Sequence, residues 1–314
     1  MSVTGAKSPL PFRISVVLEE LGTDLERALQ VVQSLGIRDV DFGSLWGRRV
    51  DCLTVAELVR ARELFERYGV QACVVGPETF KTVRLEGVPF EHLDREPALQ
   101  DALALLRAQL QVARLFGAKL SRVYSFRRSE MVSLGNPSAR HPQGGPFPLE
   151  MQAKVVRALQ LACREAERAG VTLTLENVRS CWGDSGHNTA TILQLLDSPW
   201  LKVIWDPANG FVCGEGDVAA GYEAVRAFVA HVHLKDAVLE DASTGLTRWE
   251  RIGSGQVDLR GQLERLLADG YAGCVSVETH WAPEGGDKIS NTCATHASLA
   301  EMLEGVASAH SARS

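Results

Sequence analysis

Short β-type runs alternate with longer helical patterns along almost the whole chain, and this alternation restricts the fold more than any other feature. The candidate strands are residues 12–18, 39–43, 70–76, 120–126, 171–176, 202–206, 231–235 and 274–278. In the intervening segments 24–36, 54–69, 98–117 and 150–170, apolar residues recur at helical spacing and a glycine ends each segment. Repeated strand–helix units predict an α/β fold, a parallel sheet closed into a (β/α)8 TIM barrel. The alternative is an open doubly wound sheet, but the first strand is followed by EELGTDLE and not by a G-x-G-x-x-G turn.

The length of the chain fits one domain. A barrel of about 250 residues with extensions accounts for the 314 residues. We therefore expect a single barrel domain over residues 12–306, with a flexible N-terminus over 1–11 and a flexible tail over 307–314. The Pro- and Gly-rich segment 128–149 predicts a long loop on the functional face of the barrel.

Composition narrows the range of partners. The formal net charge of −6 argues against nucleic-acid binding, although a local basic cluster could still hold a small anion. The sequence has no apolar run long enough to cross a membrane and no apolar signal-peptide region near its N-terminus. The seven cysteines include no C-x-x-C pair, which favours free thiols over disulfides or zinc knuckles. We expect a cytoplasmic protein that acts on a small molecule.

Four strand-like runs in the second half of the chain end on a metal-type ligand. Glu176, Asp206 and Glu278 close three of these runs, and His233 lies in the fourth. The carboxyl ends of parallel barrel strands meet at one face, so these side chains should share one space. Two glutamates, one aspartate and one histidine suit Mn²⁺, Mg²⁺ or Co²⁺ better than structural zinc. Taken singly, such an acid is more often a helix cap, and a histidine such as His231 more often packs or orients its neighbour.

Several motifs carry a resemblance to a known family. TLEN, VIWDPANG, HVHLKDA, the G-S-G-Q-V-D turn and GYAGCVSVETH resemble the sugar phosphate isomerase/epimerase family with a xylose isomerase-like TIM barrel. That group includes ketose 3-epimerases, inosose dehydratases and relatives of the apurinic endonucleases. The resemblance covers roughly residues 12–305. It implies one divalent metal, Mn²⁺ first among the candidates, held by Glu176, Asp206, His233 and Glu278, with the two glutamates exchanging the substrate proton.

The chain departs from the family pattern in three places. Many isomerases and epimerases carry D-x-x-H after strand six, whereas Asn209 occupies the histidine position and cannot carry a proton. Ketose 3-epimerases follow the ligand histidine with G-E-x-N-R, whereas Lys235 and Asp236 stand here. The ends of strands two and three offer no histidine, so a trinuclear phosphodiesterase site is not expected.

Further side chains past the strand ends are candidates for substrate binding. Aromatic rings can stack on a sugar, and cations can hold hydroxyl, carboxylate or phosphate groups. For each of them, ordinary packing or a solvated charge is the alternative. The predicted substrate-binding residues are Asn209, Lys235, Lys81, Trp46 and Arg179. Weaker candidates are Phe80, Trp182, Trp281 and Arg127.

Together these features predict a divalent-metal-dependent isomerase or epimerase that acts on a sugar or sugar derivative. The reaction would pass through a metal-stabilised enediolate, with Glu176 and Glu278 as acid and base. The alternative is a lyase or dehydratase of a keto-sugar or inosose on the same metal site. A third class, a sugar-binding barrel without catalysis, would not need all four ligands. The oligomeric state stays open, although the resemblance allows a homodimer.

Overall fold

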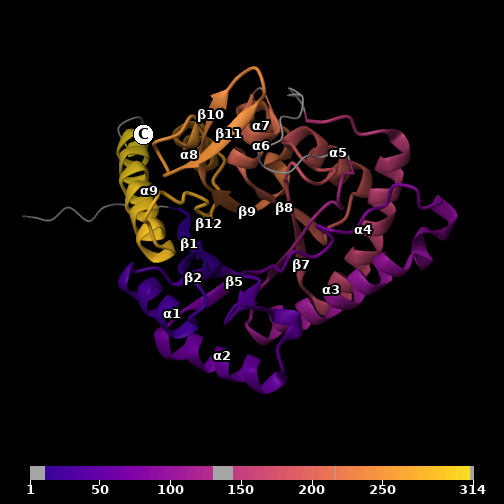
Figure 1. Ribbon diagram of the computed structural model, residues 1–314, viewed down its shortest axis with the longest axis horizontal. Helices are drawn as coiled ribbons and strands as arrows, with labels where there is room; N and C mark the ends of the chain where they lie inside the picture. Colours follow the sequence, from indigo (N-terminus) through magenta and orange to yellow (C-terminus); the bar gives the residue numbers. More distant parts are fainter. Residues whose placement is uncertain (1–10, 130–143, 216, 312–314) are drawn as a thin grey trace, which may run out of the picture.

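The protein folds into a closed barrel of eight parallel strands (Figure 1). The computed structural model describes residues 11–129, 144–215 and 217–311. Around the barrel the strand order is β1-β12-β9-β8-β7-β6-β5-β2, and every pairing between these strands is parallel. The strands are β1 (Arg13–Val17), β2 (Asp39–Phe42), β5 (Gln71–Val75), β6 (Leu120–Val123), β7 (Thr172–Glu176), β8 (Leu201–Trp205), β9 (Val229–Leu234) and β12 (Cys274–Val277). The predicted fold class is confirmed, and all eight predicted strands are present.

Helices surround the barrel on its outer side (Figure 1). The α-helices are α1 (Leu25–Ser34), α2 (Val55–Tyr68), α3 (Pro97–Leu115), α4 (Leu149–Ala169), α5 (Gly186–Leu196), α6 (Pro207–Cys213), α7 (Val218–Val225), α8 (Leu259–Ala268) and α9 (Lys288–Ser311). Short 3-10 helices are η1 (Leu18–Leu21), η2 (Val50–Cys52), η3 (Phe90–Arg95) and η4 (Arg226–Phe228). Helix α9 continues beyond residue 306, where we expected the tail to begin. No helix in the described part of the chain is long and apolar enough to span a membrane.

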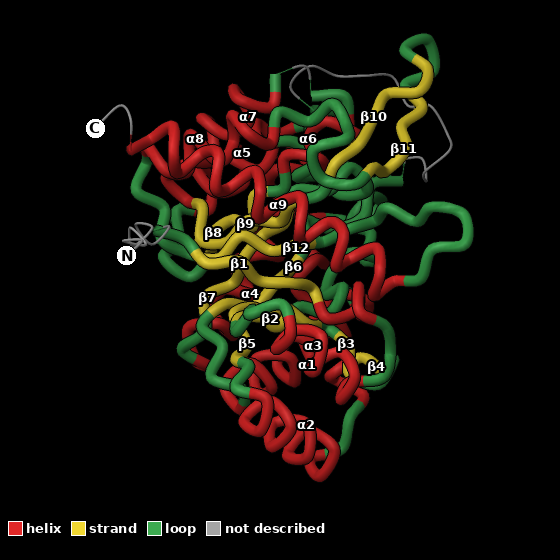
Figure 2. Tube along the Cα trace, turned by 90° about the vertical axis from the view of Figure 1, so that its left-hand side faces the viewer, coloured by secondary structure: helices red, strands yellow, loops and turns green. Residues whose placement is uncertain are grey.

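Two small antiparallel hairpins extend the loops at the carboxyl ends of the strands. The first pairs β3 (Ser44–Leu45) with β4 (Arg48–Arg49), and the second pairs β10 (Asp236–Asp241) with β11 (Leu246–Glu250). The β10–β11 hairpin follows β9 almost directly and projects from the barrel in Figure 2. The sequence analysis did not predict either hairpin. Most of the predicted loop 128–149 lies outside the described residues.

Local sequence determines where the helices begin and end, as helix α2 shows. The Thr54 side chain accepts a hydrogen bond from the Glu57 N–H, and the Glu57 carboxylate accepts one from the Thr54 N–H at 2.8 Å. This reciprocal capping box satisfies two donors that the helix itself leaves free. At the other end Gly69 adopts φ 66°, a left-handed conformation that glycine reaches without steric cost.

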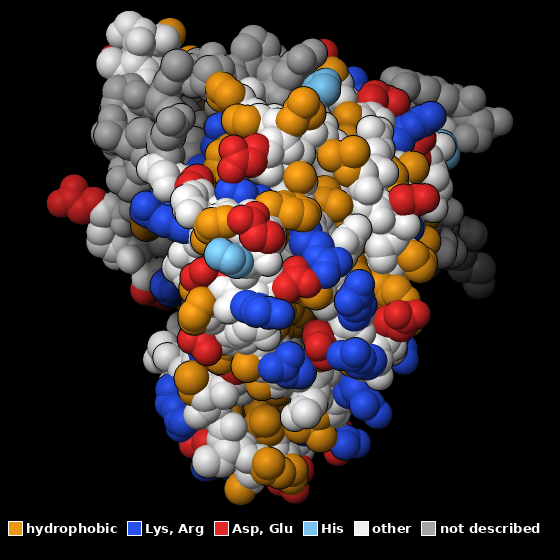
Figure 3. Space-filling model, turned by 90° about the vertical axis from the view of Figure 1, so that its right-hand side faces the viewer, with side chains coloured by type: hydrophobic (Ala, Val, Ile, Leu, Met, Phe, Trp, Pro, Cys, Tyr) orange, Lys and Arg blue, Asp and Glu red, His pale blue; other side chains and the backbone are white. Residues whose placement is uncertain are grey.

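The hydrophobic core fills the layer between the barrel and its helices. Phe42 of β2, Phe65 of α2 and Phe116 after α3 meet edge to face, with ring centroids 5.0–5.4 Å apart. Such contacts anchor the helices on the sheet and keep the strand ends in a fixed arrangement. On the outer surface shown in Figure 3, acidic and basic side chains lie interspersed. All seven cysteines are free thiols, as predicted.

Candidate active site

The barrel brings together the four strand-end residues that the sequence singled out. Glu176 is the last residue of β7, Asp206 follows β8, His233 lies in β9 and Glu278 follows β12. One ligand atom from each lies within 4.8 Å of the others. All four residues are buried, and Glu278 is the most accessible at 8% exposure. The parallel strands therefore bring together residues that lie far apart in the sequence.

The donor set fits a divalent ion. The Nδ1 atom of His233 is buried and has no hydrogen-bond partner among the residues that the structure describes. It lies 3.6 Å from Oε1 of Glu176 and 3.4 Å from Oε2 of Glu278. A buried nitrogen facing two carboxylates is an unfavourable arrangement for a neutral ring, and a cation that binds all three removes the mismatch. Carboxylate oxygens with one imidazole suit Mn²⁺ or Mg²⁺.

Two protein cations offset two of the three carboxylate charges. The Lys235 ammonium contacts Glu278 and lies 2.5 Å from Oδ2 of Asp206. The Arg122 guanidinium lies 3.1 Å from Oε2 of Glu176 and 3.6 Å from Oε1 of Glu278. Both cations are largely buried, so their charges are screened only weakly by water. The site therefore keeps its carboxylates ionised without an external ion.

The pKa values of the carboxyl groups diverge. Burial and the Glu278 charge disfavour ionisation of Glu176, but Arg122 and His233 outweigh them and lower its pKa to about 2. Burial also opposes ionisation of Glu278, yet Lys235 and His233 hold its pKa well below the usual range. For Asp206, burial dominates over the attraction of Lys235 and raises the pKa to about 6. Both glutamates are thus bases or ligands at neutral pH.

Two asparagines position the carboxylates at the ends of β7 and β8. The Asn177 side chain donates to the Asp206 carbonyl at 2.8 Å and accepts from the Asp206 N–H at 2.9 Å. Asp206 also accepts from the Asn209 N–H at 2.9 Å, so it caps α6 as well as facing the site. The Asn209 amide donates to Oε1 of Glu176 at 3.2 Å. Asn209 and Lys235 therefore lie beside the carboxylates of the site, and their binding of substrate stays a prediction.

The remaining predicted substrate-binding residues lie at differing positions. Lys81 pairs with Glu78, and its ammonium lies 5.0 Å from the centroid of the Tyr124 ring at the edge of the site. Trp46 sits in the β3–β4 turn, where the Arg60 guanidinium lies 5.8 Å from its ring centroid. Arg179 follows β7.

Arg179 is partly buried, and burial lowers the pKa of its guanidinium. Within the described part of the chain its Nη2 atom has no hydrogen-bond partner. Of the weaker candidates, Phe80 packs on Phe126 at 4.9 Å and Trp182 stacks on Phe147 at 5.6 Å. Both rings therefore pack on another aromatic ring, and their contact with a substrate stays a prediction.

Several site residues escaped the sequence analysis. Arg122 and Tyr124 alternate along LSRVYSF and face the barrel interior, and the Tyr124 hydroxyl donates to Oε2 of Glu176 at 2.9 Å. A charged residue inside a barrel strand was the available signal. Trp249 of β11 lies beside the site, with Lys235 Nζ 5.6 Å from its ring centroid and His280 packed edge-on at 5.0 Å. No sequence pattern marked Trp249, because its hairpin was not predicted.

The protein is therefore a (β/α)8 barrel with a cluster of carboxylates and one histidine at the carboxyl ends of its strands. The family model of the xylose isomerase-like TIM barrel matches residues 29–304, and the chain belongs to this family. The resemblance inferred from the motifs is thereby confirmed. A search of curated protein sequences finds no significant match.

Solved structures share the fold at low sequence identity. An L-ribulose 3-epimerase is 17% identical, with 96% of this chain and 98% of that chain covered and a TM-score of 0.70. The probable 3-DHS dehydratase AsbF from Bacillus anthracis is 12% identical, with coverage of 93% and 99% and a TM-score of 0.67. A xylose isomerase-like TIM barrel protein from Mycobacterium smegmatis, in complex with magnesium, is 15% identical, with coverage of 93% and 98% and a TM-score of 0.67.

Proposed function

We propose that this protein is a divalent-metal-dependent isomerase or epimerase that acts on a sugar or sugar derivative through an enediolate. One observation carries the proposal: two ionised glutamates face the same unpartnered nitrogen of His233 from different strands. In the barrel β7 and β12 are separated by β8 and β9, so Glu176 and Glu278 reach the mouth from different directions. A substrate carbon between them has a base on one side and an acid on the other.

Glu176, Asp206, His233 and Glu278 would hold the ion. When bound, it supplies Lewis-acid chemistry that acidifies the C–H bond beside a carbonyl. One glutamate removes that proton and the other returns a proton to the opposite face or to the neighbouring carbon. Glu278 is the more accessible of the two, whereas three donors from Arg122, Tyr124 and Asn209 hold Glu176. We also propose that Lys235 and Asn209, which contact the carboxylates of the site, bind substrate oxygens.

The family and its structural relatives support the finer points of the proposal. A relative of this fold was crystallised with magnesium, and we propose Mn²⁺ first among the divalent ions because the donors are carboxylate oxygens and one imidazole. We propose a cytoplasmic location on the basis of the seven free thiols. Homodimerisation is part of the same proposal and rests on the family resemblance alone.

A lyase or dehydratase is the second candidate. Asn209 favours it, because its amide donates to Glu176 and to the Asn177 carbonyl and cannot act as an acid or a base at neutral pH. A site that lacks one proton carrier can still form the enediolate and then expel a leaving group from the next carbon. A structural relative named as a probable dehydratase has the same fold.

Mass spectrometry in D₂O separates the two reactions. The metal-loaded enzyme is incubated with a panel of ketoses, inososes and keto-sugars. We expect an isomeric product that carries solvent deuterium, and we expect Glu278→Gln to slow its formation at least about 100-fold. Glu150→Gln, which changes an exposed glutamate on α4, should leave the rate unchanged. Loss of water without any deuterated isomer would instead assign the protein to the lyases.

A further inference from the structure

Asp41 of β2 contacts both histidines of β9, although β1 and β12 lie between these two strands in the barrel. Its Oδ2 atom lies 2.7 Å from Nε2 of His231 and 3.1 Å from Nε2 of His233. Asp41 belongs to β2, and 192 residues separate it from His233 in the sequence. All three residues are buried. Asp41 touches none of the other three predicted metal ligands by any hydrogen bond or ion pair in the described part of the chain, so its effect on the site must act through His233.

These contacts determine which ring nitrogen of His233 carries the proton. A carboxylate oxygen can only accept a hydrogen bond, so Nε2 must be the donor in each histidine. In the neutral form of His233, which is the form that binds a metal ion, the proton on Nε2 leaves the lone pair on Nδ1. Nδ1 is the atom that faces Glu176 and Glu278 and has no hydrogen-bond partner in the described structure. The orientation of the ring is supported by His231, which packs edge-on at 5.3 Å between centroids.

A cysteine of β5 holds the Asp41 side chain in place. The Cys73 thiol donates to its other oxygen, Oδ1, at 2.6 Å. Cys73 is the additional residue of a bulge in β5, because Val40 pairs with Ala72 while Asp41 pairs with Val74. A bulge of this kind re-aims a side chain, here into the barrel.

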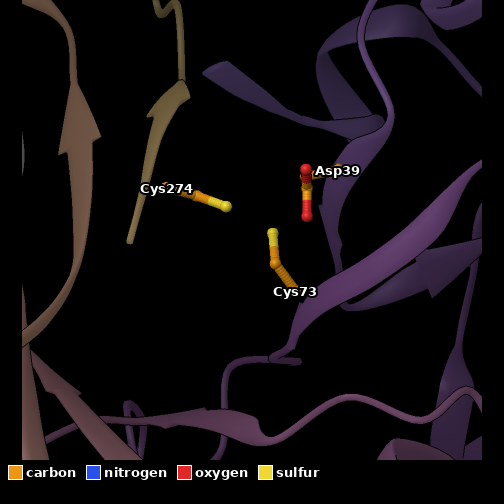
Figure 4. Close-up of side chains that lie close together, drawn as sticks. All are labelled: Asp39, Cys73 and Cys274. Carbon is orange, nitrogen blue, oxygen red and sulfur yellow. The ribbon is translucent and has the colours of Figure 1, made fainter. Parts of the chain in front are cut away.

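Deeper in the barrel, Figure 4 shows the sulfur atoms of Cys73 and Cys274 pointing toward one another, with Asp39 beside them. Asp39 is paired with Arg13 at 2.9 Å and does not contact either histidine of β9 in the described structure. Asp41 is therefore the aspartate of β2 that reaches the histidines of β9, whereas Asp39 pairs with Arg13.

We propose that Asp41 is a positioning residue that fixes the tautomer and ring orientation of His233, so that Nδ1 is free to bind the divalent ion. The inference rests on the proposed function for the ion, and it concerns a residue that touches neither the ion nor the substrate. A carboxylate that orients a ligand histidine typically changes metal affinity by 10–100-fold.

Asp41→Asn tests the proposal with little change of shape. The amide can turn its NH₂ group toward Nε2 and thereby favour the opposite tautomer, with the proton on Nδ1. We expect the affinity for Mn²⁺, measured by competition with a chelator, to fall about 10–100-fold. Asp39→Asn is the matched control, because it makes the same change two residues away on the same face of β2 and should leave the affinity unchanged. Equal affinities of the two variants would overturn the proposal.

A second readout is independent of activity and of metal binding. NMR of ¹⁵N-labelled imidazoles in the wild-type protein should show a proton on Nε2 of His233 with and without Mg²⁺, because Asp41 accepts from it in both states. His231→Ala assigns the signal to the correct ring. A His233 that lacks a proton on Nε2 would overturn the proposal even if Asp41→Asn failed to fold. A wild-type protein that binds no divalent ion would refute the proposed function, while the NMR signal would still decide the role of Asp41.

Discussion

Glu20 lies beside the candidate site, and its effect on the charge of the site could not be predicted from the sequence. It lies in η1, after β1. Burial and the repulsion of the Glu278 carboxylate raise its pKa to about 8, against the weaker attraction of Lys288 and Lys235. At neutral pH Glu20 is therefore mostly protonated and adds no further negative charge to a site that already holds three carboxylates. Its neutrality helps to keep the charges of the mouth balanced.

The raised pKa predicts a pH-dependent cost to stability. A carboxyl group whose pKa is raised in the folded state does not lower the stability of the protein at pH values below its ordinary pKa. As the pH rises from there toward about 8, the free energy of unfolding falls progressively. Between pH 5 and pH 8, in metal-free protein, the free energy of unfolding of the wild type should fall relative to Glu20→Gln by at most about 1.4 kcal/mol per pH unit. Urea unfolding of both proteins measures the difference. A difference that stays constant with pH would contradict the assignment.

The strand-end residues that the structure brings together could be predicted from the sequence, but the residues that contact them could not. Glu176 and Glu278 stand at the ends of short apolar runs, which is a local signal. Asp41 has no such signal, because its contact with His231 joins residues 190 positions apart. The same holds for Arg122, whose contact with Glu278 depends on how the barrel closes. Local patterns report on strand ends and not on the register that brings them together.

At the scale of elements, the ends of β7 and β8 are joined by the amide of Asn177. Its two hydrogen bonds to the Asp206 backbone connect the strands that carry Glu176 and Asp206. This explains why an asparagine follows the glutamate of the TLEN motif. An amide has both a donor and an acceptor, and a carboxylate at this position would lack the donor.

Asn177→Ala should therefore lower both stability and metal affinity. The substitution leaves the buried N–H and C=O of Asp206 without a partner, which costs roughly 1–3 kcal/mol. Chemical unfolding and Mn²⁺ titration measure the two effects. Asn188→Ala is the control: the Asn188 side chain bonds Gly145 and Asp184, away from the four predicted ligands, so it should lower stability and keep the metal affinity. Equal metal affinity in both variants would show that the hydrogen bonds of Asn177 do not position Asp206.

The β10–β11 hairpin shows why some elements escaped prediction. Most of its residues are only partly buried on both faces, so apolar and polar residues do not alternate in the way that marks a half-buried strand. Asp236, at its base, accepts hydrogen bonds from the Gly253, Gly255 and Val257 N–H groups and thereby folds the G-S-G-Q-V-D turn against the hairpin. Helices α1 to α4, in contrast, have apolar faces against the barrel, and they match the predicted segments 24–36, 54–69, 98–117 and 150–170.

At the scale of the whole molecule, eight repeated units made the closed barrel predictable before any contact was known. Each unit buries an apolar helix face and contributes one strand end to the same rim. The register shifts between Val40 and Asp41 and between Val203 and Ile204 could not be predicted, because they concern the pairing of each strand with a distant segment of the chain. Cys73 and His231, the two side chains that contact Asp41 beside His233, lie next to these shifts.

The most direct test of the account is the binding of Mn²⁺ to chelator-treated protein, followed by calorimetric titration and by thermal melting. We expect one ion per chain and a rise in the melting temperature, because an ion at 100 times its dissociation constant stabilises the native state by about 2.7 kcal/mol. His233→Ala should abolish both effects, whereas His231→Ala should retain the single site with weakened affinity. A wild-type protein that binds no ion and whose melting temperature ignores Mn²⁺ would contradict the account, as would loss of binding in His231→Ala but not in His233→Ala.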